Sequence, residues 1–259
     1  SNTYVGNNTG YYGTTADDNV AVGRNALLGS SGNTTGNKNV AIGSYCLDAS
    51  TTGESNIGLG YAAGGAINSA NYNIAIGDSA LSTEDQGSGN VAIGYLALQD
   101  QNTDTGRNTA VGFQAGLNLT TGTDNAFFGY NAVGLGVATG DNNCVFGYSA
   151  GYDLTSGHSN VLMGYRAGQN FTDNDSNVVI GSSAMETANS DENYNIAIGD
   201  SALQSLDGSS SDGNVAIGHT ALQTLAVAGP AMTVIGYEAG KNAPTPNNSV
   251  YIGYQAVGT

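Results

Sequence analysis

The feature that most constrains this chain is a short motif, Asn-x-x-x-Gly-x-x-Ala, which returns at intervals of 17 to 20 residues from one end to the other. A repeat this short cannot bury a core of its own, so successive repeats must stack as the coils of a solenoid. We therefore predict an all-β fold, a parallel β-solenoid of about 15 coils, that occupies residues 1–259 as a single domain. The repeated glycines are Gly6, Gly23, Gly43, Gly60, Gly77, Gly94, Gly112, Gly129, Gly147, Gly164, Gly181, Gly199, Gly218, Gly236 and Gly253.

Positions counted from this anchoring glycine follow clear rules. Position −1 is apolar in every coil, and position −3 is Val, Ile, Thr, Ala or Cys. Because β-branched residues suit a packed strand surface, we expect positions −3 and −1 to face the interior of the coil. Position −2 then lies on the outer face, where it is never charged or amidic, and an apolar strip of this kind indicates an interface between chains. The residues predicted for that interface are Tyr4, Phe127, Val145, Leu162, Val179, Val234 and Tyr251.

Three other positions have structural explanations. Asn occupies position −4 in thirteen coils, which predicts a ladder of hydrogen bonds from coil to coil. The glycine indicates a positive φ angle or a close approach of a neighbouring backbone. Ala at position +3 is expected to point into a narrow interior corner, and position +4, which varies between Leu, Val, Met and Gly, to pack less tightly.

The charge balance excludes some classes of function. The chain has 21 acidic and five basic residues, a net charge of −16, and no charge at the three positions before the glycine. It should therefore repel nucleic acid, and it has no apolar segment of the ~20 residues needed for insertion into a membrane. The two cysteines, Cys46 and Cys144, lie too many coils apart for an intrachain disulfide, and both are expected to fill small apolar slots.

Few residues suggest chemistry. Carboxylate pairs such as Glu84/Asp85 and Asp191/Glu192 leave a polysaccharide-cleaving activity open, but we predict no catalytic residue and no enzyme. His158 and His219 do not repeat and have no evident acidic partner in sequence. Asp173 and Asp175 alternate with amides and are a weak candidate for Ca²⁺, with a simple polar turn as the alternative; no other cofactor is expected.

Tyrosine follows the anchoring glycine in seven coils. Such a row suits the stacking of sugars, and it suits packing between chains equally well. The sequence leaves both interpretations open. The residues of this predicted surface row are Tyr61, Tyr95, Tyr130, Tyr148, Tyr165, Tyr237 and Tyr254.

The phrase Asn-Val-Ala-Ile-Gly at residues 39–43, 90–94 and 214–218 resembles the head repeats of trimeric autotransporter adhesins. Residues 105–115 and 121–132 are similar to the Thr-Thr-Gly-x-x-Asn-Thr-Ala-Val-Gly-x-x-Ala repeats of phage and bacterial tail-fibre-type proteins. The resemblance covers essentially the whole chain. It implies a left-handed parallel β-roll with three chains side by side, which binds host matrix or cell surfaces in the adhesins and a bacterial surface receptor in the phage fibres. The coils of this chain are longer than the adhesin repeat, so its turns are larger.

These observations predict a structural and adhesive fibre segment, a homotrimer that displays a repeated surface to a cell-surface receptor or glycan. Its expected place is extracellular, on a cell surface or in a virion. The first alternative is a self-assembling extracellular filament subunit, because the first and last repeats keep the apolar pattern instead of polar caps. The second alternative is a polysaccharide-cleaving tailspike.

Overall fold

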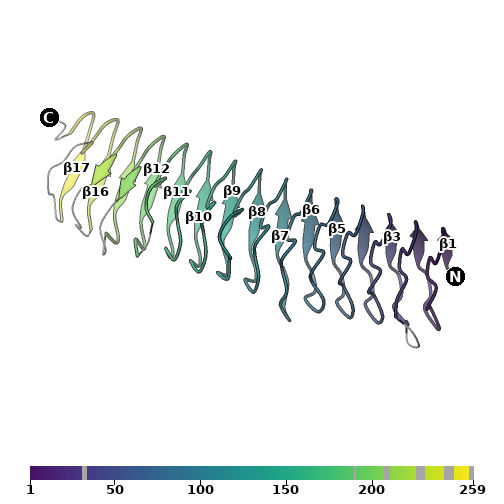
Figure 1. Cartoon of the computed structure of the whole chain (residues 1–259). Helices are drawn as coiled ribbons and strands as arrows, with labels where there is room; N and C mark the ends of the chain where they lie inside the picture. The colour runs from purple at the N-terminus through teal and green to yellow at the C-terminus, as the bar shows by residue number, and fades with distance from the viewer. Residues whose placement is uncertain (31–33, 190, 207–210, 226–230, 242–247, 257–259) are drawn as a thin grey trace. The chain divides into compact units, whose positions relative to one another are not determined.

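The computed structural model of the chain describes residues 1–30, 34–189, 191–206, 211–225, 231–241 and 248–256 (Figure 1). It divides into two compact units, Ser1–Asn125 and Ala126–Thr259. Strands, isolated bridges, turns and bends make up all the structure assigned in these ranges, which hold no helix long and apolar enough to cross a membrane. Each unit is a parallel β-solenoid, so the predicted all-β solenoid fold is confirmed.

The first unit stacks one short strand per coil. Strands pair residues at the same distance from the anchoring glycine, such as Val20 with Val40 and Val22 with Ile42. The alignment of repeats read from the sequence is therefore the register of the sheet. The strands of this unit are β1 (Thr3–Val5), β2 (Val20–Val22), β3 (Val40–Ile42), β4 (Ile57–Leu59), β5 (Ile74–Ile76), β6 (Val91–Ile93) and β7 (Thr109–Val111).

The second unit follows the same rule, with Val161 paired to Val178 and Met163 to Ile180. Two of its coils add a second, two-residue strand each, β13 (Ser205–Leu206) and β15 (Thr224–Leu225), and these two strands also pair in parallel. The remaining strands are β8 (Ala126–Phe128), β9 (Cys144–Phe146), β10 (Val161–Met163), β11 (Val178–Ile180), β12 (Ile196–Ile198), β14 (Val215–Ile217), β16 (Thr233–Ile235) and β17 (Val250–Ile252).

The anchoring glycine is required for two separate reasons. Gly60 has a φ angle of +139°, which L side chains rarely adopt. A Cβ atom on Gly60 would also lie 2.5 Å from the carbonyl oxygen of Gly77 in the next coil. Gly6 is alike, with φ +137° and 2.5 Å to the Gly23 oxygen. Both features expected from the sequence, positive φ and close backbone approach, are present together.

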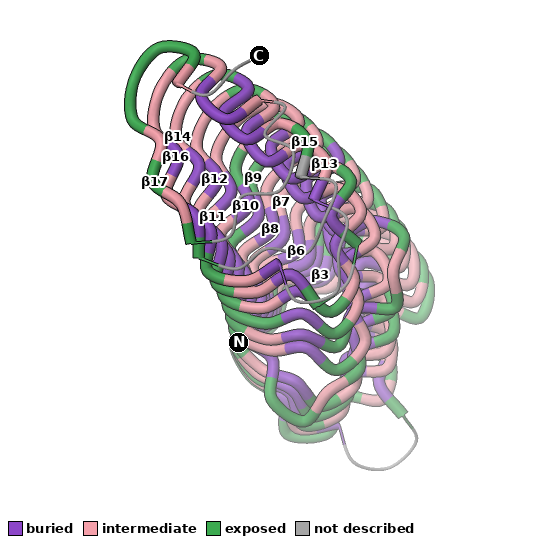
Figure 2. The backbone as a smooth tube through the Cα atoms, turned by 90° about the vertical axis from the view of Figure 1, so that its left-hand side faces the viewer, coloured by how far each residue is buried: buried purple, intermediate pink, exposed green. Residues whose placement is uncertain are grey.

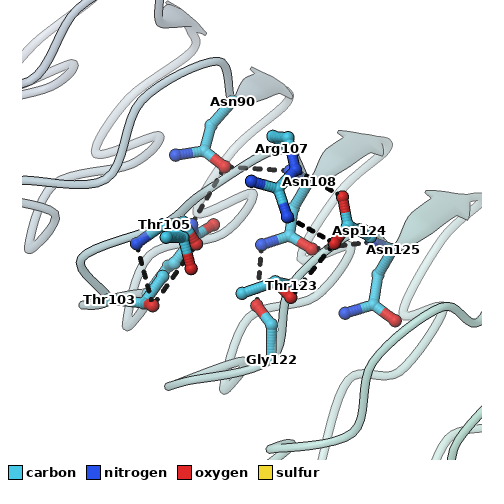
Figure 3. A network of polar contacts seen from close by, with 10 residues as sticks. Asn90, Thr103, Thr105, Arg107, Asn108, Gly122, Thr123, Asp124 and Asn125 are labelled. Carbon is cyan, nitrogen blue, oxygen red and sulfur yellow. Dashed lines mark hydrogen bonds and ion pairs between the residues drawn. The ribbon is translucent and has the colours of Figure 1, made fainter.

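The Asn residues at position −4 form the predicted ladder. Asn56 is fully buried; its side-chain oxygen accepts the backbone N–H of Asn73 at 2.9 Å, and its amide group donates to the carbonyl of Ala70 at 2.8 Å. Both acceptor and donor are thus used on one neighbouring coil. Figure 3 shows the same arrangement at Asn108, which donates to the Gly122 carbonyl at 2.8 Å. Because buried backbone groups need partners, each Asn closes the hydrogen bonding of the next strand entry.

Beside the ladder in Figure 3, an exposed ion pair links two successive coils. Arg107 Nε donates to Asp124 Oδ1 and Arg107 Nη2 to Asp124 Oδ2, each at 2.6 Å. The hydrogen bond from the guanidinium lowers the pKa of the Asp124 carboxyl. The ion pair occupies the position directly before Asn in both coils, where residues have positive φ angles near 60°.

The interior of each coil is narrow and is filled mostly by small residues. Position −2 points inward, as Ala21, Ala41 and Ala75 do with no exposed surface, and Ala at position +3 is buried as well, as at Ala26 and Ala63. Buried residues recur at the same places in successive coils (Figure 2). Position +4 is also interior, since Leu47 and Leu81 are fully buried, so the expectation of loose packing there was wrong.

Position +4 is Gly where another side chain needs its space. A Cβ atom on Gly10 would lie 2.5 Å from the ring of Tyr4, and one on Gly168 would lie 3.0 Å from Leu162. The large side chains of Tyr4 and Leu162 at position −2 therefore have a glycine at position +4 of their coil, whereas Phe127 shares its coil with Val133 and Val179 with Met185. Where both positions are small, as in the coil of Gly58, a residue further along fills the core, and Ile67 does so with no exposed surface.

Candidate binding and assembly surfaces

The strand face that points into the coil is the opposite of the one predicted from the sequence: position −2 is inside, and positions −3 and −1 are outside. Phe127, Val145 and Leu162 are buried inside their coils, as are Val179 and Val234, and Tyr4 and Tyr251 are half-buried. The prediction that this row forms an interface between chains was therefore wrong. The physical reason is volume, because the narrow interior takes mostly small residues at position −2, and a glycine at position +4 leaves room for larger ones such as Tyr4 and Leu162.

The two flanking rows are the outer ones. We call positions −3 and −1 of each strand the outer strand face. Ile42 is 39% exposed, Leu59 44% and Phe146 55%, although all three are large apolar side chains. No charged residue occupies either row in any coil. A contiguous apolar sheet face of this kind is the usual mark of a protein interface.

The aromatic row at position +1 lies at the surface, as predicted. Tyr61, Tyr95, Tyr130, Tyr148, Tyr165, Tyr237 and Tyr254 are all at least 45% exposed. In the second unit, Tyr130 stacks on Tyr148 with ring centroids 5.1 Å apart, and Tyr148 stacks on Tyr165 at 5.5 Å. Tyr237 likewise lies between His219 and Tyr254.

This stacking limits how the row can bind a sugar. The rings of Tyr130 and Tyr148 are within 5° of parallel, so each covers a face of the other. A sugar that stacks on an aromatic ring needs an open face. In this run Tyr148 lies between two rings, and the guanidinium of Arg166 lies over Tyr165, 5.0 Å from the ring centroid. The middle of a run presents ring edges and hydroxyl groups instead, which favours hydrogen bonding or edge contacts over stacking.

The candidate calcium residues serve the backbone. Asp175 Oδ1 accepts the N–H of His158 in the preceding coil at 2.6 Å. Asp173 Oδ1 accepts from the Thr172 hydroxyl at 3.2 Å and the Asp191 N–H at 3.3 Å. The two carboxylates thus bond in different directions, and among the described residues no group of three or more His, Cys, Asp or Glu could hold a metal ion. The structure supports the polar-turn alternative at these residues.

Two carboxylates from the pairs that suggested a polysaccharide-cleaving activity, Glu84 and Glu192, lie in the interior of the solenoid. Glu84 is fully buried, and its Oε1 accepts the backbone N–H of Gly87 at 2.6 Å while its Oε2 has no partner. Burial raises the pKa of this carboxyl, partly offset by its backbone hydrogen bonds. Glu192 is also buried and accepts from the side-chain amide of Asn174 at 2.8 Å. Both carboxylates are buried and hydrogen-bonded within the stack of coils, so neither is accessible to a polymeric substrate.

Each histidine has an acidic neighbour that the sequence reading missed, because it lies one coil earlier. His158 Nδ1 accepts the N–H of Asp141 at 2.9 Å, which makes the ring a backbone acceptor. His219 Nε2 lies 3.7 Å from Asp200 Oδ1, and its Nδ1 lies 3.4 Å from the hydroxyl of Thr220. Thr220 is only 5% exposed, so this hydroxyl is shielded from substrate.

The two cysteines differ. Cys46 is buried at position +3, as expected, and burial raises the pKa of its thiol to about 12. Cys144 is exposed, which contradicts the expectation that it fills an interior slot, since it belongs to the outer strand face.

No protein-family model, curated protein or solved structure shows significant similarity to this chain.

Proposed function

We propose that this chain is a structural and adhesive fibre segment, in which three copies pack side by side through the outer strand face. The observation that carries the proposal is that face. It consists of two uncharged rows that are mostly apolar, such as Val20 and Val22 on one strand and Ile57 and Leu59 on another, which are 36–44% exposed. Burying such side chains is worth roughly 25 cal/mol per Å² of apolar area, so a row of coils provides a large driving force for association.

A second copy of the chain is the partner that fits this face best. The rows repeat at the strand spacing of a sheet, roughly 4.8 Å, and another copy repeats at the same spacing. The net charge of −16 resides outside the three strand positions, so turns of neighbouring copies repel each other while the uncharged faces do not. Self-association through the face is the arrangement that both features favour.

The finer features of the proposal rest on the resemblance of the Asn-Val-Ala-Ile-Gly motif to the repeats of adhesin heads and tail-fibre-type proteins. They are a left-handed coil, a threefold assembly and a place outside the cell or in a virion. The aromatic row at position +1 lies directly beyond the glycine that ends the face, so it would border the contact between copies. We assign receptor or glycan binding to this border, through phenol hydroxyls such as that of Tyr148, which is 48% exposed.

The native cysteines provide the test of assembly. Maleimide reacts with thiolates, so Cys144 should label rapidly in the free chain, whereas the buried Cys46 with its raised pKa should not. Light scattering should give the mass of a trimer, and Cys144 should be protected in the trimer and labelled after dilution into monomers. The variant Cys144→Ser should show no labelling in either state. A stable monomer, or a trimer with fully reactive Cys144, would contradict the proposal.

A charge on the face should separate the copies. Ile198→Glu places a carboxylate on β12 in the outer strand face and should convert trimer to monomer, because an unpaired charge would be buried between copies. Asn189→Glu adds the same charge at an exposed turn of the same unit and should leave the mass unchanged. Tyr148→Ala should weaken binding on a glycan array while the mass stays that of a trimer.

A further inference from the structure

One stretch of the outer strand face departs from its Val and Ile pattern. Phe128 and Phe146 are the only aromatic residues at position −1, and they stack with centroids 6.0 Å apart. The same two coils carry the only Ala and Cys at position −3, namely Ala126 and Cys144. Phe146 is 55% exposed and Cys144 is exposed beside it on the same strand. Two large side chains are thus matched with two small ones.

We infer that this patch on β8 and β9 fixes the axial register of neighbouring copies. The inference rests on the proposed side-by-side assembly. In a closed ring of copies whose axis is parallel to the stack, each strand runs around the ring, so position −1 of one copy faces position −3 of the next at the same level. Phe146 of one copy then enters the notch left by Cys144 of its neighbour, and Phe128 enters the notch at Ala126.

A register device is needed because successive strands of the same unit have nearly identical outer pairs. Along β11, β12 and β14 the outer pairs are Val or Ile throughout. A slip by one coil, roughly 4.8 Å, would exchange one β-branched pair for another at little cost. At the patch the same slip would bring Phe146 against Val161 and leave a void at Ala126. Overfilled and empty contacts are both unfavourable, so the patch selects one alignment.

Mixing two variants tests the facing residues. Cys144→Phe alone overfills the contact and Phe146→Cys alone empties it, so each should weaken self-association about tenfold or more. When the two proteins carry different tags and are mixed, mixed assemblies should exceed the random proportion, because the large side chain of one now meets the small side chain of the other. Phe128→Cys is the matched control, and it should show no such preference when mixed with Cys144→Phe.

Cross-linking provides a second readout that does not depend on affinity. In Phe146→Cys, the new thiol should lie beside the native Cys144 of the next copy, so dibromobimane should link chains covalently. In Phe128→Cys the new thiol faces Ala126, and linkage should remain at the wild-type level. If Phe128→Cys, and not Phe146→Cys, assembled preferentially with Cys144→Phe or cross-linked between chains, the proposed alignment of the copies would be wrong. If the two variants behaved equally, the patch would not determine the alignment. A wild-type protein that is monomeric at all concentrations would instead contradict the proposed function.

Discussion

Removal of one side chain from the Asn ladder should destabilise the solenoid far more than removal of an Asn from a turn. Asn56 lies in the middle of the first unit and is fully buried. In Asn56→Ala the backbone N–H of Asn73 loses its acceptor and the carbonyl of Ala70 loses its donor, which are held at 2.9 and 2.8 Å. Both groups belong to buried residues, since Ala70 is 1% exposed and Asn73 is fully buried.

The size of the effect follows from these two orphaned groups. A buried backbone group left without a partner costs about 1–3 kcal/mol. Two such groups give about 2–6 kcal/mol, and the small void adds to this value. The control is Asn102→Ala in the same unit, at an exposed turn position. Surface substitutions of this kind change the free energy of unfolding by less than about 0.5 kcal/mol.

Two measurements compare these variants. Urea unfolding followed by far-ultraviolet circular dichroism gives the free energy of unfolding, with tyrosine fluorescence as a second probe because the chain has no tryptophan. Since coils can open locally, hydrogen exchange should show the loss of protection concentrated in β4 and β5, the strands that Asn56 and Asn73 enter. Equal destabilisation by Asn56→Ala and Asn102→Ala, or exchange spread evenly over the first unit, would refute the reasoning.

Three further predictions concern the coil interior. Gly60→Ala should prevent stable stacking, because its Cβ would lie 2.5 Å from a carbonyl oxygen, whereas Gly213→Ala, which has positive φ but open space, should cost only about 1–2 kcal/mol in thermal or urea unfolding. Phe171→Ala should cost about 3–5 kcal/mol as a buried cavity, with no change in the mass of the assembly. Burial raises the pKa of Glu84, so the stability that its proton contributes is present below the ordinary carboxyl pKa and lost as pH rises through the raised one. Glu84→Gln should therefore gain stability relative to wild type as pH rises from about 4 towards 7, measured by urea unfolding at each pH.

Much of the architecture could be predicted from the repeat, because the physical demands on its key residues are local. A glycine with φ near +139° and an Asn that bonds the next coil recur at fixed places, and their spacing gave the strand register of Val20 with Val40 directly. The acidic neighbours of His158 and His219 could not be seen in this way. They become neighbours only when coils stack, 17 and 19 residues apart in sequence.

Which face of the strand points into the core could have been predicted from a signal other than hydrophobicity. The three strand positions are apolar in most coils, with Thr at position −3 in three of them, so alternation between polar and apolar residues could not identify the inner face. Size identifies it in some coils, since Tyr4 and Leu162 at position −2 coincide with Gly10 and Gly168 at position +4, and a Cβ on either glycine would meet those side chains. Residues that compensate for each other's volume share a space, and this pair of positions shares the interior.

Side chains on the outer strand face also compensate for each other's volume. Ala126 with Phe128 and Cys144 with Phe146 also compensate in volume, yet these positions are not enclosed by their own coil, and Phe146 remains 55% exposed. If these side chains faced only solvent, nothing would restrict the combined volume of the two residues of a pair. A limit arises when a second surface closes over them, and for an uncharged face that repeats at every coil, another copy in the same register is the surface that would impose it.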